Sequence, residues 1–157
     1  MGRKKQIFNP GDVFLISLPD ANFALGQVVS CELSCMDSVL CVFFKDKFET
    51  EQVAGEFAPS LSDVLSVQLT TRDLLDLGTW KIVKASSPLV VESIFPINEL
   101  RKKGYVGAKI RGSKIMTDLV CAYHGLEIWD DYADPNYLDS LLAPGVHRPT
   151  NAALKQR

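Results

Sequence analysis

Short apolar runs separated by turn-forming residues occupy most of the chain before residue 110. They are rich in β-branched and aromatic residues, which is typical of β-strands. The runs span residues 13–18, 23–30, 39–44, 64–70, 80–84, 89–94 and 105–110. The run at 89–94 is only a short candidate edge segment, and Gly26 inside the second run indicates a bulge or a close backbone approach. Because no long helical pattern separates the runs, they predict a curved, mostly antiparallel sheet, open or barrel-like.

Helical signals in the same region are short. Residues 59–63 offer a hydroxyl cap followed by an acid, which predicts a single helical turn. Residues 72–77 follow Thr71 and end at a glycine, and residues 96–103 begin at a proline and end with three bases before another glycine. Both patterns predict short helices. Residues 45–58 have mixed charge and no period, so we expect an exposed loop there.

The main helical pattern begins at Ser113, whose side chain can cap a helix N-terminus, and ends at Gly125, which suits a helix C-terminus. Between them, apolar residues recur every three or four positions. Asp134 followed by a proline then predicts a second short helix over residues 135–142. The predicted fold class is therefore α+β, with a few short helices of which the main ones are C-terminal.

The length of 157 residues predicts a single domain at 12–142, between a flexible tail at 1–11 and a loosely ordered tail at 143–157. No apolar run approaches the roughly 20 residues that span a membrane, and the first residues lack the apolar stretch of a secretory signal. We therefore expect a cytoplasmic protein with no membrane partner and with free thiols. The four cysteines are Cys31, Cys35, Cys41 and Cys121.

Charge is divided unevenly along the chain, although the formal net charge is only −2. Residues 101–114 contain six bases and no acid, whereas residues 115–147 contain six acids and no Lys or Arg. The basic block with Tyr105 would suit nucleic-acid phosphates, but a chain with a pI near 5.7 lacks the overall basic footprint of such proteins. We therefore expect no nucleic acid as a partner.

The acidic block indicates a surface that binds another macromolecule, because carboxylates pair with basic groups and tyrosines supply rigid contact area. The candidate partner-binding residues are Glu127, Asp130, Asp131, Tyr132, Tyr137 and Asp139. A second candidate face comprises Asp46, Glu49, Glu51 and Glu56. A purely structural interpretation also fits, since Asp134 can cap a helix, Trp129 can be buried and Asp130 can bond loop backbone.

Catalytic chemistry has one weak candidate pair. Cys121 and His124 lie at helical spacing, as a nucleophile and its base would, but a buried cysteine and a helix-end histidine explain the same pattern. The nucleophile elbow, the P-loop and the dinucleotide-binding glycine motif are missing from the sequence, and two histidines are too few for a binuclear metal hydrolase. We expect no catalytic residues, no metal and no cofactor.

Four stretches together resemble the immunity protein 26 family, which are bacterial antidote proteins encoded beside polymorphic toxins. The stretches are PGDVFLISLPDANFALGQVV, TRDLLDLGTWKIV, YVGAKIRGS and YHGLEIWDDYADPNYLDSLL, and they lie between residues 10 and 142. Pro10-Gly11-Asp12 and Leu18-Pro19 match the opening strand of the family, and Trp80 matches its mid-chain tryptophan.

The resemblance implies a protein that binds the C-terminal domain of a cognate toxin and occludes its active surface without catalysis. A nuclease from a contact-dependent growth inhibition system or another polymorphic toxin system is the expected toxin, and the oligomeric state stays open. The family is also labelled as similar to a small phosphotriesterase. A small esterase or phosphotriesterase-like hydrolase is therefore the alternative function, and a nucleic-acid-binding module is a second alternative.

Overall fold

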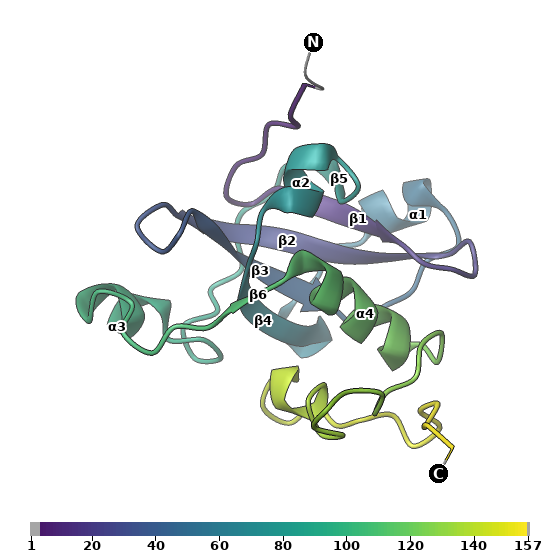
Figure 1. Ribbon diagram of the computed structural model, residues 1–157. Coiled ribbons are helices and arrows are strands. Elements are labelled where there is room, and N and C mark those ends of the chain that lie inside the picture. Colours follow the sequence, from purple (N-terminus) through teal and green to yellow (C-terminus); the bar gives the residue numbers. More distant parts are fainter. Residues whose placement is uncertain (1–3, 157) are drawn as a thin grey trace.

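The structure is a computed structural model that describes residues 4–156, and it is built on an open six-stranded sheet (Figure 1). The strand order is β5-β1-β2-β3-β4-β6. The strands are β1 (Val13–Ser17), β2 (Phe23–Glu32), β3 (Ser38–Phe44), β4 (Val64–Thr70), β5 (Lys81–Lys84) and β6 (Ile110–Arg111). Neighbouring strands are antiparallel except β4 and β6, which pair in parallel. The predicted α+β class with a mostly antiparallel sheet is confirmed, and the sheet does not close into a barrel.

Helices and loops cover both faces of the sheet, because successive strand residues point to opposite faces. The helices are α1 (Glu51–Glu56), α2 (Asp73–Leu77), α3 (Ile97–Lys102), α4 (Ser113–Tyr123) and the single turns η1 (Leu61–Asp63) and η2 (Asp139–Leu141). α4 and α2 lie over one face, whereas α1 and α3 contribute to the apolar cluster of the other (Figure 1). None of the helices formed by residues 4–156 has the length and hydropathy needed to cross a membrane.

Three aromatic rings form the centre of the face under α4. The Phe14 ring stacks on Trp80 with centroids 4.8 Å apart, and Phe43 meets both rings edge-on. The Trp80 Nε1 donates a 3.1 Å hydrogen bond to Thr117 of α4, which ties the helix to the sheet. Gly26 lies opposite Phe14, and an added Cβ there would stand 2.3 Å from the Phe14 ring. The predicted close backbone approach at Gly26 is therefore confirmed.

The strands predicted between residues 13 and 84 form with ends shifted by at most two residues, but the exposed loop predicted at 45–58 is wrong. This segment contains α1, which begins after Thr50 because the Thr50 hydroxyl accepts the Val53 N–H at 3.1 Å. The predicted single turn that follows is confirmed as η1, with Ser60 and Asp63 in a capping box.

Two predicted strands do not form. Residues 89–94 make a turn instead, in which the Ile94 N–H donates to the Val91 carbonyl at 2.9 Å. Residues 105–110 cannot run extended, because Tyr105 has a φ of 63° and lies in the left-handed region. Strand pairing in this region is therefore limited to the two residues of β6.

The C-terminal helices differ in detail from the prediction. α4 ends before Gly125 as predicted, but Gly112 is its N-cap residue and the Ser113 hydroxyl donates to Asp73 instead. The second helix predicted over 135–142 is wrong, and η2 is the only regular piece within it. Most backbone N–H groups there bond to carbonyls three residues back, and only the Ser140 N–H also reaches a carbonyl four residues back, so the chain makes successive turns rather than an α-helix.

Both terminal segments contact the sheet. The Gln6 side chain donates to the Trp80 carbonyl at 2.9 Å, and the Ala143 N–H donates to the Leu65 carbonyl of β4 at 2.9 Å. The C-terminal segment runs below α4 and beside β4 in Figure 1. That the two tails are loosely held in solution stays a prediction.

Candidate partner-binding surface

A polar pocket of about 260 Å³ lies between α4 and the loop that follows it. Asp118 of α4 and Glu127, Asp131 and Tyr132 of the loop line it, and we call these four residues the acidic pocket. Burial raises the pKa of Tyr132, and the charges of the three surrounding carboxylates raise it further. The three carboxylates therefore line one pocket together with Tyr132.

Lysines of the same chain lie near two of these carboxylates. The Nζ of Lys114 is 3.2 Å from Asp118, and the Nζ of Lys155 is 3.0 Å from Asp131. Glu127 forms no ion pair with any residue between 4 and 156. Both lysines are exposed, and exposed ion pairs contribute only about 0–1 kcal/mol. Basic side chains of a partner can therefore replace them at small cost.

The other predicted acids are used inside the chain. Asp130 is only 8% exposed and accepts a 2.6 Å hydrogen bond from the Lys155 backbone N–H. Asp139 pairs with Arg148 at 2.5 Å, and this contact lowers the pKa of Asp139. The Arg148 guanidinium lies 5.9 Å from the ring centre of the buried Trp129. These contacts fix the loop that carries the acidic pocket.

Two tyrosines connect the acidic pocket with the sheet. The ring centres of Tyr132 and Tyr137 are 5.4 Å apart. Arg111 of β6 donates to the Tyr137 hydroxyl at 3.2 Å and lies over the Tyr137 ring.

Asp118 completes the acidic pocket and was not among the predicted partner-binding residues. Its position on the polar side of the α4 pattern, one turn after an exposed lysine, is the signal that could have found it.

The four acids of the second predicted face differ in their exposure and in their contacts. Glu51 pairs with Lys81 at 3.2 Å and lines a separate pocket beside α1 and β5. Asp46 is half-buried, and burial raises its pKa. Glu49 is exposed just before α1, and Glu56 is exposed as the last residue of α1. These two glutamates are therefore the members of the second face that are most accessible to a partner.

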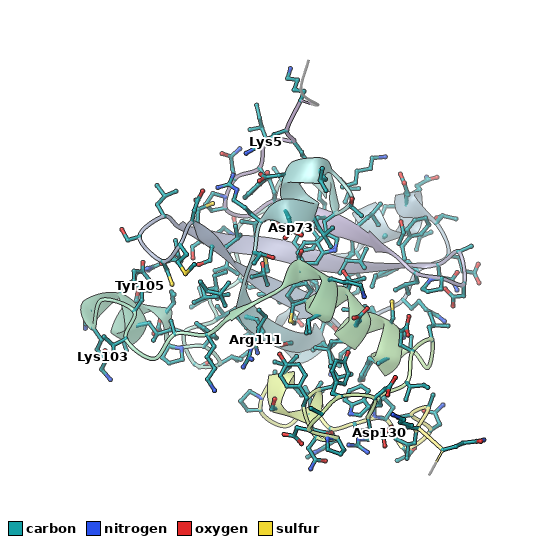
Figure 2. The ribbon with its side chains drawn as sticks, viewed as in Figure 1. Lys5, Asp73, Lys103, Tyr105, Arg111 and Asp130 are labelled. Atoms are coloured by element: carbon teal, nitrogen blue, oxygen red, sulfur yellow. The ribbon has the colours of Figure 1, made fainter. Side chains whose placement is uncertain are left out.

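The basic block is spread over separate parts of the molecule. Arg101 pairs with the buried Glu32 through two nitrogens, at 2.7 and 2.8 Å. Figure 2 shows Lys103 at the far end of α3 and Arg111 beside β4 and α4. The bases that are clustered in sequence are therefore not gathered in space as a nucleic-acid surface would require.

The catalytic candidates are not arranged as a nucleophile and base. Cys121 is 4% exposed, and burial raises its pKa to about 11, so its thiol is protonated at neutral pH. Burial lowers the pKa of His124, and among residues 4–156 no hydrogen bond joins its ring to the Cys121 thiol. The described part of the chain also contains no group of three or more His, Cys, Asp and Glu side chains placed to hold a metal ion.

Comparison with known proteins identifies the family. The family model described as Immunity protein 26 matches residues 9–105, which is more than half of the chain and contains β1 to β5 and α1 to α3. The first two resembling stretches lie inside this match, whereas α4 and the acidic pocket lie beyond it. Searches among curated proteins and among solved structures gave no match. The chain therefore belongs to the immunity protein 26 family and is an immunity protein against a polymorphic toxin.

Proposed function

We propose that this immunity protein acts in the cytoplasm and docks its acidic pocket against the basic active surface of the C-terminal domain of its toxin. We infer that the toxin is a nuclease, because nucleases hold nucleic-acid phosphates with Lys and Arg side chains. The observation that carries the proposal is that three carboxylates and Tyr132 line the same pocket. Docking covers the active surface of the toxin and requires no turnover by the immunity protein.

The contacts that hold the loop of the acidic pocket, and the position of this pocket along the chain, favour this role. The buried Trp129 and the pair of Asp139 with Arg148 hold the loop in place, so its carboxylates lose little conformational entropy on binding. The acidic pocket lies outside the region that matches the family model, which suits a surface that selects one toxin among many. Exposed negative charge also speeds association with a basic partner in a salt-dependent way.

Replacing Glu127 and Asp131 together by lysine is expected to slow association with the toxin domain encoded beside the gene by about tenfold or more at low salt. The reason is that the replacement reverses the local field that attracts the basic surface of the toxin. Surface plasmon resonance at several salt concentrations measures the association rate constant. Both side chains are exposed, so the thermal unfolding midpoint should stay near that of the wild type.

The matched control is the double variant Glu49→Lys with Glu56→Lys, which changes the net charge by the same amount at the second candidate face. At about 0.1 M salt we expect its association rate to stay within about twofold of wild type, because charges far from the interface are screened beyond a Debye length of about 10 Å. If this control associates slowly with the toxin domain while the Glu127 and Asp131 variant associates at the wild-type rate, the interface lies at α1 instead. Equal rates for wild type and both variants would reject electrostatic docking at either face.

A further inference from the structure

A second concave surface lies where the turn between β2 and β3, the start of α2 and the residues before β6 meet. It has a volume of about 890 Å³, and its apolar lining comes from Met36, Ala108 and Ile110. Met36 is 88% exposed, although a methionine of this size normally gains by burial. Asp73 is among the polar residues of the lining. We call this surface the apolar groove.

Asp73 is held firmly within the apolar groove. The hydroxyls of Thr71 and Ser113 both donate 2.6 Å hydrogen bonds to its Oδ1 atom. Ser113 is itself buried at the start of α4, and its N–H donates to the Thr71 hydroxyl at 2.9 Å. Burial raises the pKa of Asp73, but the hydrogen bonds from Ser113 and Thr71 outweigh it and leave the pKa lowered. An ionised carboxylate is therefore fixed between α2 and α4 (Figure 2).

The arginine of the groove is already paired with two other acids of the lining. Arg72 pairs with Asp37 at 2.9 Å and with Asp76 at 3.1 Å, and its guanidinium lies over the Phe8 ring. Within residues 4–156, no Lys or Arg forms an ion pair with Asp73. The apolar groove thus combines a fixed negative charge that lacks a cation with an accessible apolar lining.

This combination matches the side chain of an arginine. Long basic side chains have an apolar stem that packs against apolar surface and a charged head that needs an acid. The guanidinium is planar and weakly hydrated, so it suits an apolar-lined groove better than the ammonium of lysine does. The turns that carry Met36 and Ala108 also expose Leu33 and Val106, which extends the apolar area around the groove.

We propose that the apolar groove binds an arginine side chain of the toxin domain, with the stem against Met36 and Ile110 and the guanidinium at Asp73. The inference rests on the proposed function, since the toxin is the partner, and it adds a second contact to the acidic pocket. Asp73 bonds to the first residue of α4, and Asp118 lies five residues further along that helix, which is roughly 8 Å. One interface of ordinary size can include both.

Butylguanidinium, which mimics the head and stem of arginine, tests the groove without the toxin. In an NMR titration we expect it to shift the methyl resonances of Met36, Ala108 and Ile110, and its neutral analogue butylurea to shift them several-fold less. Asp73→Asn should remove the difference between the two compounds, whereas the control Glu99→Gln, an exposed acid on α3, should preserve it. Equal shifts for both compounds in the wild type, or shifts centred on other residues, would overturn the assignment.

The toxin domain provides the second arm of the test. Asp73→Asn and Met36→Asn should each weaken its Kd roughly tenfold, the cost of losing one charge-assisted contact or its apolar support. Asparagine tolerates the positive φ of 54° at position 36, so Met36→Asn keeps the turn, and Val90→Asn is an exposed control elsewhere that should leave the Kd unchanged. If wild type binds and both groove variants bind equally well, this proposal fails while the proposed function stands. If wild type does not bind at all, the proposed function fails first.

Discussion

Replacing Trp80 by alanine is expected to lower the free energy of unfolding by about 3–5 kcal/mol. Trp80 is fully buried and stacks on Phe14, so its removal leaves a large cavity at the centre of the core. The change also removes the hydrogen bond from the indole to Thr117, which ties the residue before β5 to α4. Urea unfolding followed by circular dichroism measures the loss as a lower midpoint.

Trp80→Phe is the matched control, because it keeps an aromatic ring next to Phe14 but lacks the indole N–H. We expect a smaller loss of about 1–2 kcal/mol, from a smaller cavity and from the lost indole hydrogen bond, since the Thr117 hydroxyl still donates to the Ser113 carbonyl at 3.1 Å. An alanine variant as stable as the phenylalanine variant would show that the aromatic cluster does not hold the core together.

Replacing Arg101 by methionine is expected to lower the free energy of unfolding by about 3 kcal/mol at neutral pH. The variant leaves the carboxylate of Glu32, which is 2% exposed, with the Tyr105 hydroxyl at 2.8 Å and without its cation. Burial alone raises the pKa of Glu32, but the hydrogen bond and charge of Arg101, together with neighbouring hydroxyls that include Tyr105, outweigh it and bring the pKa from 4.5 to about 2. The whole shift corresponds to roughly 3 kcal/mol, to which Arg101 contributes through both its hydrogen bond and its charge.

The sign of the pH dependence follows from the direction of this shift. Because the pKa of Glu32 is lower in the folded state, its ion pair stabilises the fold fully above the ordinary pKa of 4.5. This stabilisation is lost as the pH falls toward 2. The difference in stability between wild type and Arg101→Met should therefore shrink across that range in urea unfolding at stepped pH. Lys102→Met, at a neighbouring exposed base, should show almost no difference, and a constant difference for Arg101→Met would contradict the ion pair.

The strands of the sheet could be predicted because each depends on local patterning. β4, for example, alternates apolar and polar residues between clear turn residues, and its predicted ends are those observed. The wrong predictions lie where tertiary contacts, or residues in the left-handed φ region, determine the backbone conformation. Tyr105 has a positive φ, and its hydroxyl donates a hydrogen bond to Glu32. The pattern of residues in the sequence does not indicate this contact. The strand order, with β5 returning beside β1, is likewise set by packing between distant segments.

The candidate surface could be predicted only in part, for a related reason. Composition identified an acidic, aromatic segment, but burial decides which of its acids can meet a partner. Asp130 and Asp139 bond residues of the C-terminal segment, and those partners lie too far along the sequence to be recognised by spacing. The apolar groove was not predicted, because its lining comes from three separate parts of the chain.

The most direct test of docking without turnover is a titration of the purified toxin domain with the purified immunity protein, with toxin activity as the readout. Docking predicts that activity falls in proportion to added protein, reaches its end point at a fixed molar ratio and does not change with longer incubation. It also predicts that both chains are recovered intact from the complex. If much less than one equivalent of immunity protein inactivates the toxin domain, and the inactivation increases with time, the protein turns over and the account is contradicted.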